Sequence, residues 1–301
     1  MIGDSENISG VRGAWRWWPL RFLVLFAVFL FLYAGCQIAT IILAKNLPPS
    51  IPQPLFAIGV AAVGAIMMIL AYRVLIRWTE RRPASELGAS HAILQLIGGA
   101  IIGFVLFASV YAVLWAYGAV TFKGWNAPDG MAAAAGMALL SGVGEEIIFR
   151  GVVYRLFEEG LGTLIAIVLS GALFGLIHAA NKGATLESTL AIALEAGILL
   201  AASYILTRSL WLPIGLHFGW NFTEGGIFGA AVSGGHMKGL INAPLSGPVS
   251  LTGGAFGPEA SLPAVGICLV AALVMLVLAA TRGQWKPLSF RFRSPEGTGT
   301  A

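Results

Sequence analysis

Runs of about 20 apolar residues recur along the chain, and they constrain its fold more than any other feature. A helix of that length is long enough to cross the hydrocarbon core of a bilayer. Eight such runs are present, so the sequence predicts an all-α bundle of eight transmembrane helices. They lie at about residues 20–44, 55–76, 93–119, 131–157, 161–180, 187–207, 211–232 and 262–281.

The composition excludes a water-soluble domain. Only 11% of the residues are charged and 57% are hydrophobic, with a mean hydropathy of +0.84, whereas soluble proteins carry about 25% charged residues. The net charge is +4, but no basic patch interleaved with aromatic residues lies outside the apolar runs. We therefore expect membrane lipid, and no nucleic acid, among the partners.

The basic residues predict the orientation of the chain. With eight spans both termini share one side of the membrane, and 14 of the 18 Lys and Arg residues fall on that side. Basic residues concentrate in cytoplasmic loops. The sequence therefore predicts a multi-pass protein of a bacterial-type cell membrane with both termini in the cytoplasm.

Three regions follow from this organisation. Residues 1–130 hold a tail and three predicted spans, residues 131–232 hold four spans with most of the intramembrane polar groups, and residues 233–301 hold a Gly- and Pro-rich loop, the last span and a basic tail. The loop at about 233–261 is long for a helix bundle and could hold re-entrant structure.

Ionisable side chains inside membrane spans are costly and usually functional. Glu146 and Arg150 lie four residues apart in the fourth run, so they can form an ion pair on one helix face. Glu145 points about 100° around the helix axis from Glu146 and is left without a local counter-ion. A carboxylate in that position suits a general base acting on water.

The neighbouring runs supply further polar groups. His217 and Asn221 are also four residues apart, and two such donors could hold a developing oxyanion. In the fifth run, Gly171 and Gly175 lie on one stripe with His178, which predicts close helix packing with His178 toward the bundle interior. A second pair of small residues, at 215 and 219, predicts close packing of the seventh run.

Three motifs carry a resemblance to a known family. They read Glu145-Glu146-Ile147-Ile148-Phe149-Arg150, then Phe174-Gly175-Leu176-Ile177-His178, then His217-Phe218-Gly219-Trp220-Asn221. In this order, with each motif on its own apolar run, they resemble the EExxxR, FxxxH and HxxxN motifs of the CPBP intramembrane protease family. That family includes type II CAAX prenyl proteases and bacteriocin-immunity proteins, and the resemblance covers about residues 130–232.

The resemblance implies an endopeptidase whose active site lies within the bilayer and whose substrate is a membrane-associated peptide or lipidated protein. It implies that Glu145 and His178 activate water, while His217 and Asn221 stabilise the oxyanion. Glu146 and Arg150 would then support the site. The residues fit a second class as well, a non-catalytic membrane protein such as a bacteriocin immunity factor or a transporter.

Two questions stay open in the sequence. Glu145, His178 and His217 form a possible His₂Glu zinc set, but no HExxH helix is present, and we favour the version without metal. Glu195 in the sixth run is either a partner of a catalytic histidine or a separate packing contact. Glu224, three residues after Asn221, is interpreted as structural.

Overall fold

The computed structural model describes residues 17–46 and 52–292. The tails predicted to be cytoplasmic, residues 1–16 and 293–301, lie outside the described residues. The long helices are α2 (Trp18–Lys45), α3 (Gln53–Glu80), α4 (Ala92–Ala116), α5 (Met131–Glu146), α6 (Arg155–Leu161), α7 (Thr163–His178), α8 (Leu186–Leu194), α9 (Ala196–Thr207), α10 (Trp211–Asn221) and α12 (Leu262–Thr281).

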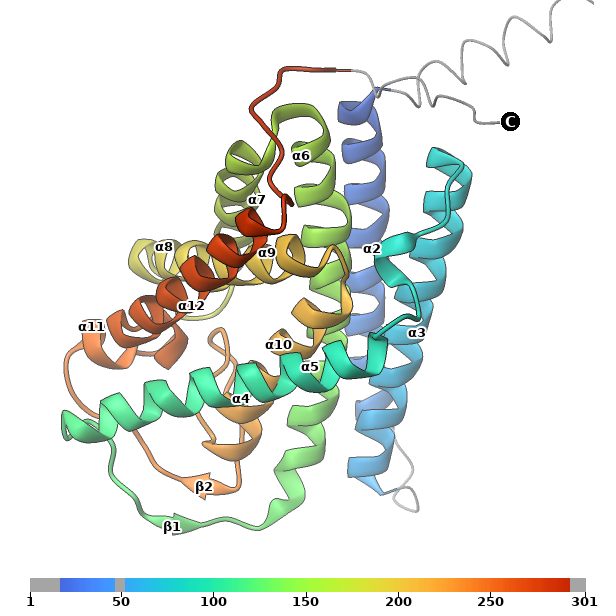
Figure 1. Ribbon diagram of the computed structural model, residues 1–301. Coiled ribbons are helices and arrows are strands. Elements are labelled where there is room, and N and C mark those ends of the chain that lie inside the picture. The colour runs from blue at the N-terminus through green and yellow to red at the C-terminus, as the bar shows by residue number, and fades with distance from the viewer. Residues whose placement is uncertain (1–16, 47–51, 293–301) are drawn as a thin grey trace, which may run out of the picture.

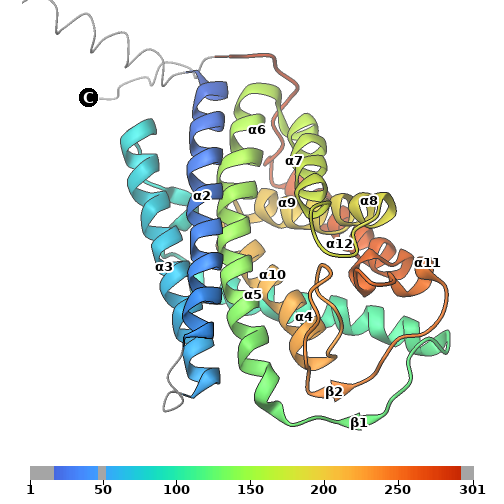
Figure 2. The same ribbon diagram turned by 180° about the vertical axis from the view of Figure 1, so that it is seen from behind.

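Helices α2 and α3 and the continuous helix α5–α6 stand side by side as an upright layer (Figure 1). Helix α4 crosses this layer at a steep angle and packs along α10. Figure 2 shows α8, α9 and α12 gathered to one side of the upright helices. A pair of two-residue strands, β1 (Gly124–Trp125) and β2 (Ile241–Asn242), is the only sheet in the part of the chain described.

The all-α membrane bundle predicted from the sequence is confirmed, and six helices are long and apolar enough to span a membrane. The predicted spans at 161–180 and 211–232 do form helices, but α7 has 16 residues and α10 has 11 before it widens. Both are shorter than the roughly 20 residues that a straight crossing requires. The orientation of the termini stays a prediction.

Two wide π-helical segments interrupt the α-helices. One, Ile147–Tyr154, joins α5 to α6 directly after Glu146, and the other, Phe222–Ile227, follows Asn221 at the end of α10. Such segments are rare and occur frequently at functional sites. Here the first begins inside the first motif, directly after Glu146, and the second begins at the residue after the third motif.

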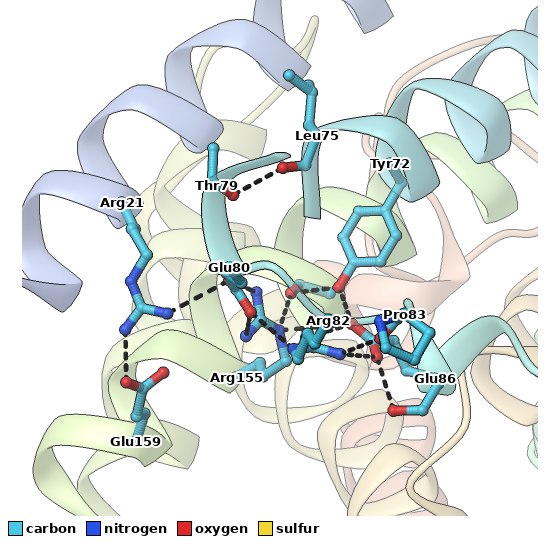
Figure 3. Close-up of polar contacts among 12 residues, drawn as sticks. Arg21, Tyr72, Leu75, Thr79, Glu80, Arg82, Pro83, Glu86, Arg155 and Glu159 are labelled. Carbon is cyan, nitrogen blue, oxygen red and sulfur yellow. Dashed lines mark hydrogen bonds and ion pairs between the residues drawn. The ribbon is translucent and has the colours of Figure 1, made fainter. Parts of the chain in front are cut away.

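Ion pairs join α2, α3 and α6 at one end of the upright layer (Figure 3). Arg155 holds Glu80 through two contacts of 2.6 and 2.9 Å, and Arg82 holds Glu86 through two of 2.8 and 2.9 Å. Arg21 lies 2.5 Å from a Glu159 oxygen and 3.5 Å from a Glu80 oxygen. We call this set the arginine–glutamate network, and its members are Arg21, Glu80, Arg82, Glu86, Arg155 and Glu159.

The network holds both the π-helix and the loop after α3. Tyr72 lies within hydrogen-bond distance of Glu86, and its hydroxyl is 2.9 Å from the Gly151 carbonyl oxygen (Figure 3). Arg155 Nε donates to the same carbonyl at 2.8 Å. Burial alone would raise the pKa of Glu86, but its hydrogen bonds from Arg82 and the charges of Arg155 and Arg82 lower that pKa to about 2.

Glycines allow α4 and α10 to approach backbone to backbone. An added Cβ on Gly103 would overlap the Leu216 carbonyl oxygen, and one on Gly219 would overlap the Ala100 carbonyl oxygen. The close packing predicted for Gly215 and Gly219 is therefore present, and α4 supplies the matching pair, Gly99 and Gly103. This contact fixes the helix that carries His217 and Asn221.

Candidate active site

Glu145 lies in the last turn of α5, with its carboxylate between α2 and two histidines. Oε1 accepts a hydrogen bond of 3.0 Å from the Tyr33 hydroxyl. Oε2 lies 3.8 Å from His178 Nε2 and 4.0 Å from His217 Nε2. This oxygen is buried and has no hydrogen-bond partner among residues 17–46 and 52–292. A single water can bridge groups at such separations.

Both histidines are held by their Nδ1 atoms. His178 Nδ1 lies 2.7 Å from the Phe174 carbonyl oxygen, which can only accept, so this nitrogen carries a proton. His217 Nδ1 lies 2.9 Å from Glu146 Oε1. In the neutral rings Nε2 is therefore the free acceptor of each, and both Nε2 atoms face the same carboxylate oxygen. The stripe predicted for α7 is confirmed, because His178 is buried beside Gly171 and Gly175.

Glu146 and Arg150 form the intrahelical ion pair predicted from their spacing, at 2.9 Å. Arg150 also donates to the Ala196 and Gly197 carbonyl oxygens at 2.9 and 3.2 Å. Its guanidinium lies over the Phe174 ring, 4.8 Å from the ring centre. The pair therefore ties α5, α7 and α9 together while Glu146 orients His217.

Asn221 lies one turn after His217 and donates from Nδ2 to the Ser141 hydroxyl at 3.1 Å. The amide carries two hydrogens on Nδ2, so one remains for a ligand. Asn221, His178 and His217 line a small cavity of about 30 Å³ inside the bundle. Glu145 is not among the residues lining that cavity, but its Oε2 faces the two imidazoles that do.

The cavity is also lined by residues outside the three motifs. Glu195, at the break between α8 and α9, lines the cavity with Ser233 and Glu259 from the loop after α10. Glu195 makes no hydrogen bond to either histidine in the described chain, so the interpretation as a histidine partner is wrong. The acid that holds His217 is Glu146.

Tyr33 was also missed by the sequence analysis. It lies on α2, 112 residues before Glu145, and Gln37 one turn further on donates to its hydroxyl at 3.1 Å. Two polar side chains four residues apart inside an apolar run were the only signal in the sequence, and nothing in that run indicates which helix they face.

The possible zinc ligands form a chemically suitable set. Their Nδ1 anchors resemble those that orient metal-binding imidazoles. Among the described residues, however, no group of three or more His, Cys, Asp and Glu side chains is arranged to hold a metal ion. The version without metal stays a prediction, and the side chains themselves are available for acid–base chemistry.

Comparison with protein families finds one match. Residues 127–223 match the sequence model of the type II CAAX prenyl endopeptidase Rce1-like family. Comparisons with curated proteins and with solved structures find no significant match. The matched segment includes all three motifs, so the resemblance predicted from them is confirmed there. Residues 127–223 of this membrane-spanning chain are therefore similar to the type II CAAX prenyl endopeptidase Rce1-like family.

Proposed function

We propose that this chain hydrolyses a peptide bond of a membrane-associated, CAAX-type substrate with a water activated by Glu145 and His178, without a metal ion. The observation that carries the proposal is the position of Glu145 Oε2, which faces two histidine Nε2 atoms at 3.8 and 4.0 Å and has no other partner among the described residues. A water held there has three possible hydrogen-bond acceptors, namely Glu145 Oε2 and the two histidine Nε2 atoms. Of these, the Glu145 carboxylate can act as the base.

The reaction follows from these atoms. Glu145 accepts a proton as the water oxygen bonds to the carbonyl carbon, and the carbonyl oxygen becomes an oxyanion. Asn221 Nδ2 donates to that oxyanion, and His217 joins it when its ring is doubly protonated, a state that the Glu146 carboxylate favours. The carbon–nitrogen bond then breaks, and Glu145 returns its proton to the leaving amine.

The supporting residues keep this geometry in place. Glu146 fixes the ring of His217, and Arg150 balances the charge of Glu146 while it anchors α9. Prenylated substrates suit a site inside the bilayer, because the lipid group can stay in the membrane while the peptide enters the cavity. The family match also supports a substrate of this kind.

The test uses the purified full chain in proteoliposomes with internally quenched peptides, both farnesylated CAAX peptides and unmodified ones. Glu145→Gln keeps the size of the side chain but removes the base, so the rate of cleavage should fall by about 10²- to 10⁴-fold. Glu187→Gln, which removes an exposed carboxylate from α8, is the matched control and should cleave as fast as the wild type.

Two results would overturn the proposal. If Glu145→Gln cleaves as fast as the wild type, the base has been assigned to the wrong residue. If cleavage is lost on treatment with a chelator and returns with zinc, the metal-free mechanism is wrong, and elemental analysis of the purified protein would then show stoichiometric metal.

A further inference from the structure

Three glutamates beside the cavity lack a basic partner. Glu195, Glu224 and Glu259 are 2%, 0% and 3% exposed. In the described part of the chain, none of them has a Lys, Arg or His nitrogen within 4.0 Å. Glu195 and Glu259 line the same cavity as His217 and Asn221, and we call these two residues the acidic wall.

Glu195 is the less satisfied member of the acidic wall. Its Oε1 atom is buried and has no hydrogen-bond partner among the described residues. The Cys268 thiol on α12 interacts with the carboxyl but carries no positive charge. Arg150 is the cation that acts on it from a distance, yet that guanidinium is already bound by Glu146 and by two backbone carbonyls.

Hydrogen bonds hold the Glu259 carboxylate in its place beside the cavity. Its Oε1 atom accepts hydrogen bonds from the backbone nitrogen and the hydroxyl of Ser233, at 2.7 and 2.8 Å. Glu224 lies behind it, and the two carboxyls interact directly. The loop after α10 therefore fixes the position of the Glu259 carboxyl in the cavity.

A buried carboxylate without a counter-charge is costly, and the cost falls when a cation enters beside it. A divalent metal would need three converging ligands, and the described residues hold no such group. A long cationic side chain needs only one or two carboxylates within reach and an apolar path for its stem. Ile192, Leu199 and Leu200 line the same cavity and provide that path.

We infer that Glu195 and Glu259 form a subsite for a Lys or Arg side chain of the substrate, close to the bond that is cleaved. The inference rests on the proposed function, because the cavity must receive a peptide. It adds a charge requirement to a substrate that the family match describes only as a CAAX-type protein.

Pairs of internally quenched farnesylated peptides provide the test. The members of a pair differ only in Lys or norleucine, a neutral side chain of similar length, at one of the three residues on either side of the cleaved bond. With the wild-type protein, kcat/KM should be at least tenfold higher for the Lys peptide in one pair, as expected for a charged hydrogen bond. Glu195→Gln should remove that advantage, so that the Lys and norleucine peptides of the pair are cleaved with similar kcat/KM.

The controls separate recognition from folding. Glu187→Gln on the exposed face of α8 should keep the full preference for Lys. Glu259→Gln is the second test of the wall and should also reduce the preference. An equal loss for both peptides in Glu195→Gln would mean a structural role, and the absence of a Lys preference in the wild type would equally overturn the inference.

Binding distinguishes a failed subsite from a failed enzyme assignment. If no peptide is cleaved, the same Lys and norleucine peptides, carrying a fluorophore, are titrated against Glu145→Gln and against the double variant Glu145→Gln/Glu195→Gln. Tighter binding of the Lys peptide by the single variant alone supports the acidic wall as a cation subsite without catalysis. Equal binding of the two peptides overturns it.

Discussion

The arginine–glutamate network and the candidate active site lie at opposite ends of the same π-helix, and their carboxylates are partnered in opposite ways. Each glutamate of the network contacts an arginine, and Glu80 and Glu86 are each bound through two contacts by one arginine. In the site, Glu145 Oε2 and Glu195 Oε1 are buried without a hydrogen-bond partner among the described residues. The same residue type thus serves two purposes.

The two regions differ in whether their carboxylates have an oxygen left to bind a ligand. A carboxylate already paired with arginine has its charge offset, and it contributes to the stability of the fold. A buried carboxylate with a free oxygen costs stability, and proteins retain such groups mainly where activity needs them. Removing network residues should therefore reduce stability, whereas changes in the site should reduce turnover.

The largest expected effect is on the network. Arg155→Met removes both contacts to Glu80, the 3.6 Å contact to Glu86 and the bond to the Gly151 carbonyl. Glu80 then keeps only its contacts with Arg82 and Arg21. We expect a loss of about 3–5 kcal/mol in the free energy of unfolding, measured by denaturant titration in detergent. Arg77→Met at an exposed position of α3 is the control, and a variant as stable as this control would remove the contrast between the two regions.

Acidification should also lower the free energy of unfolding, by somewhat less than the Arg155→Met substitution does. The pKa of Glu86 is lowered to about 2 in the folded chain, below its value in the unfolded chain. Its contribution to stability is therefore present above about pH 4.5 and is lost as the pH falls toward 2, on the order of 3 kcal/mol in total. Unfolding measured from pH 6 to pH 2 should show this slope, and Glu86→Gln should lack that part of it.

The smallest expected effect concerns the orientation of Glu145. Tyr33→Phe removes the hydrogen bond to Oε1 but leaves the base and both histidines in place. We expect kcat to fall about tenfold, as for the loss of one charged hydrogen bond, with little change in stability. Tyr117→Phe, at an exposed end of α4, is the matched control, and unchanged kcat in Tyr33→Phe would mean that Glu145 needs no such anchor.

Local spacing was sufficient to predict part of this structure. The apolar runs predict helices, and the four-residue spacing of Glu146 and Arg150 predicts their ion pair, because both depend only on neighbours along one helix. The ordered motifs likewise predict which polar residues meet.

Contacts between distant helices could not be predicted. Tyr33 reaches Glu145 across 112 residues, and Glu259 enters the cavity from a loop that has no periodic pattern. The partner of His217 was also ambiguous, since two adjacent glutamates and Glu195 were equally available in the sequence. Helix ends could not be predicted either, because the apolar runs at 161–180 and 211–232 continue past the ends of α7 and α10.

The π-helix Ile147–Tyr154 has a consequence for tolerance to insertion and deletion. It lies between Glu145 and Glu146 on one side and Arg155 on the other, so its wide turn sets the angle at which the acids face the imidazoles while the arginine stays bound to α3. A chain shortened by one residue there would keep each half intact yet rotate one against the other by about 100°. Insertions and deletions within this segment should therefore disrupt the site, even where substitutions of its side chains have only small effects.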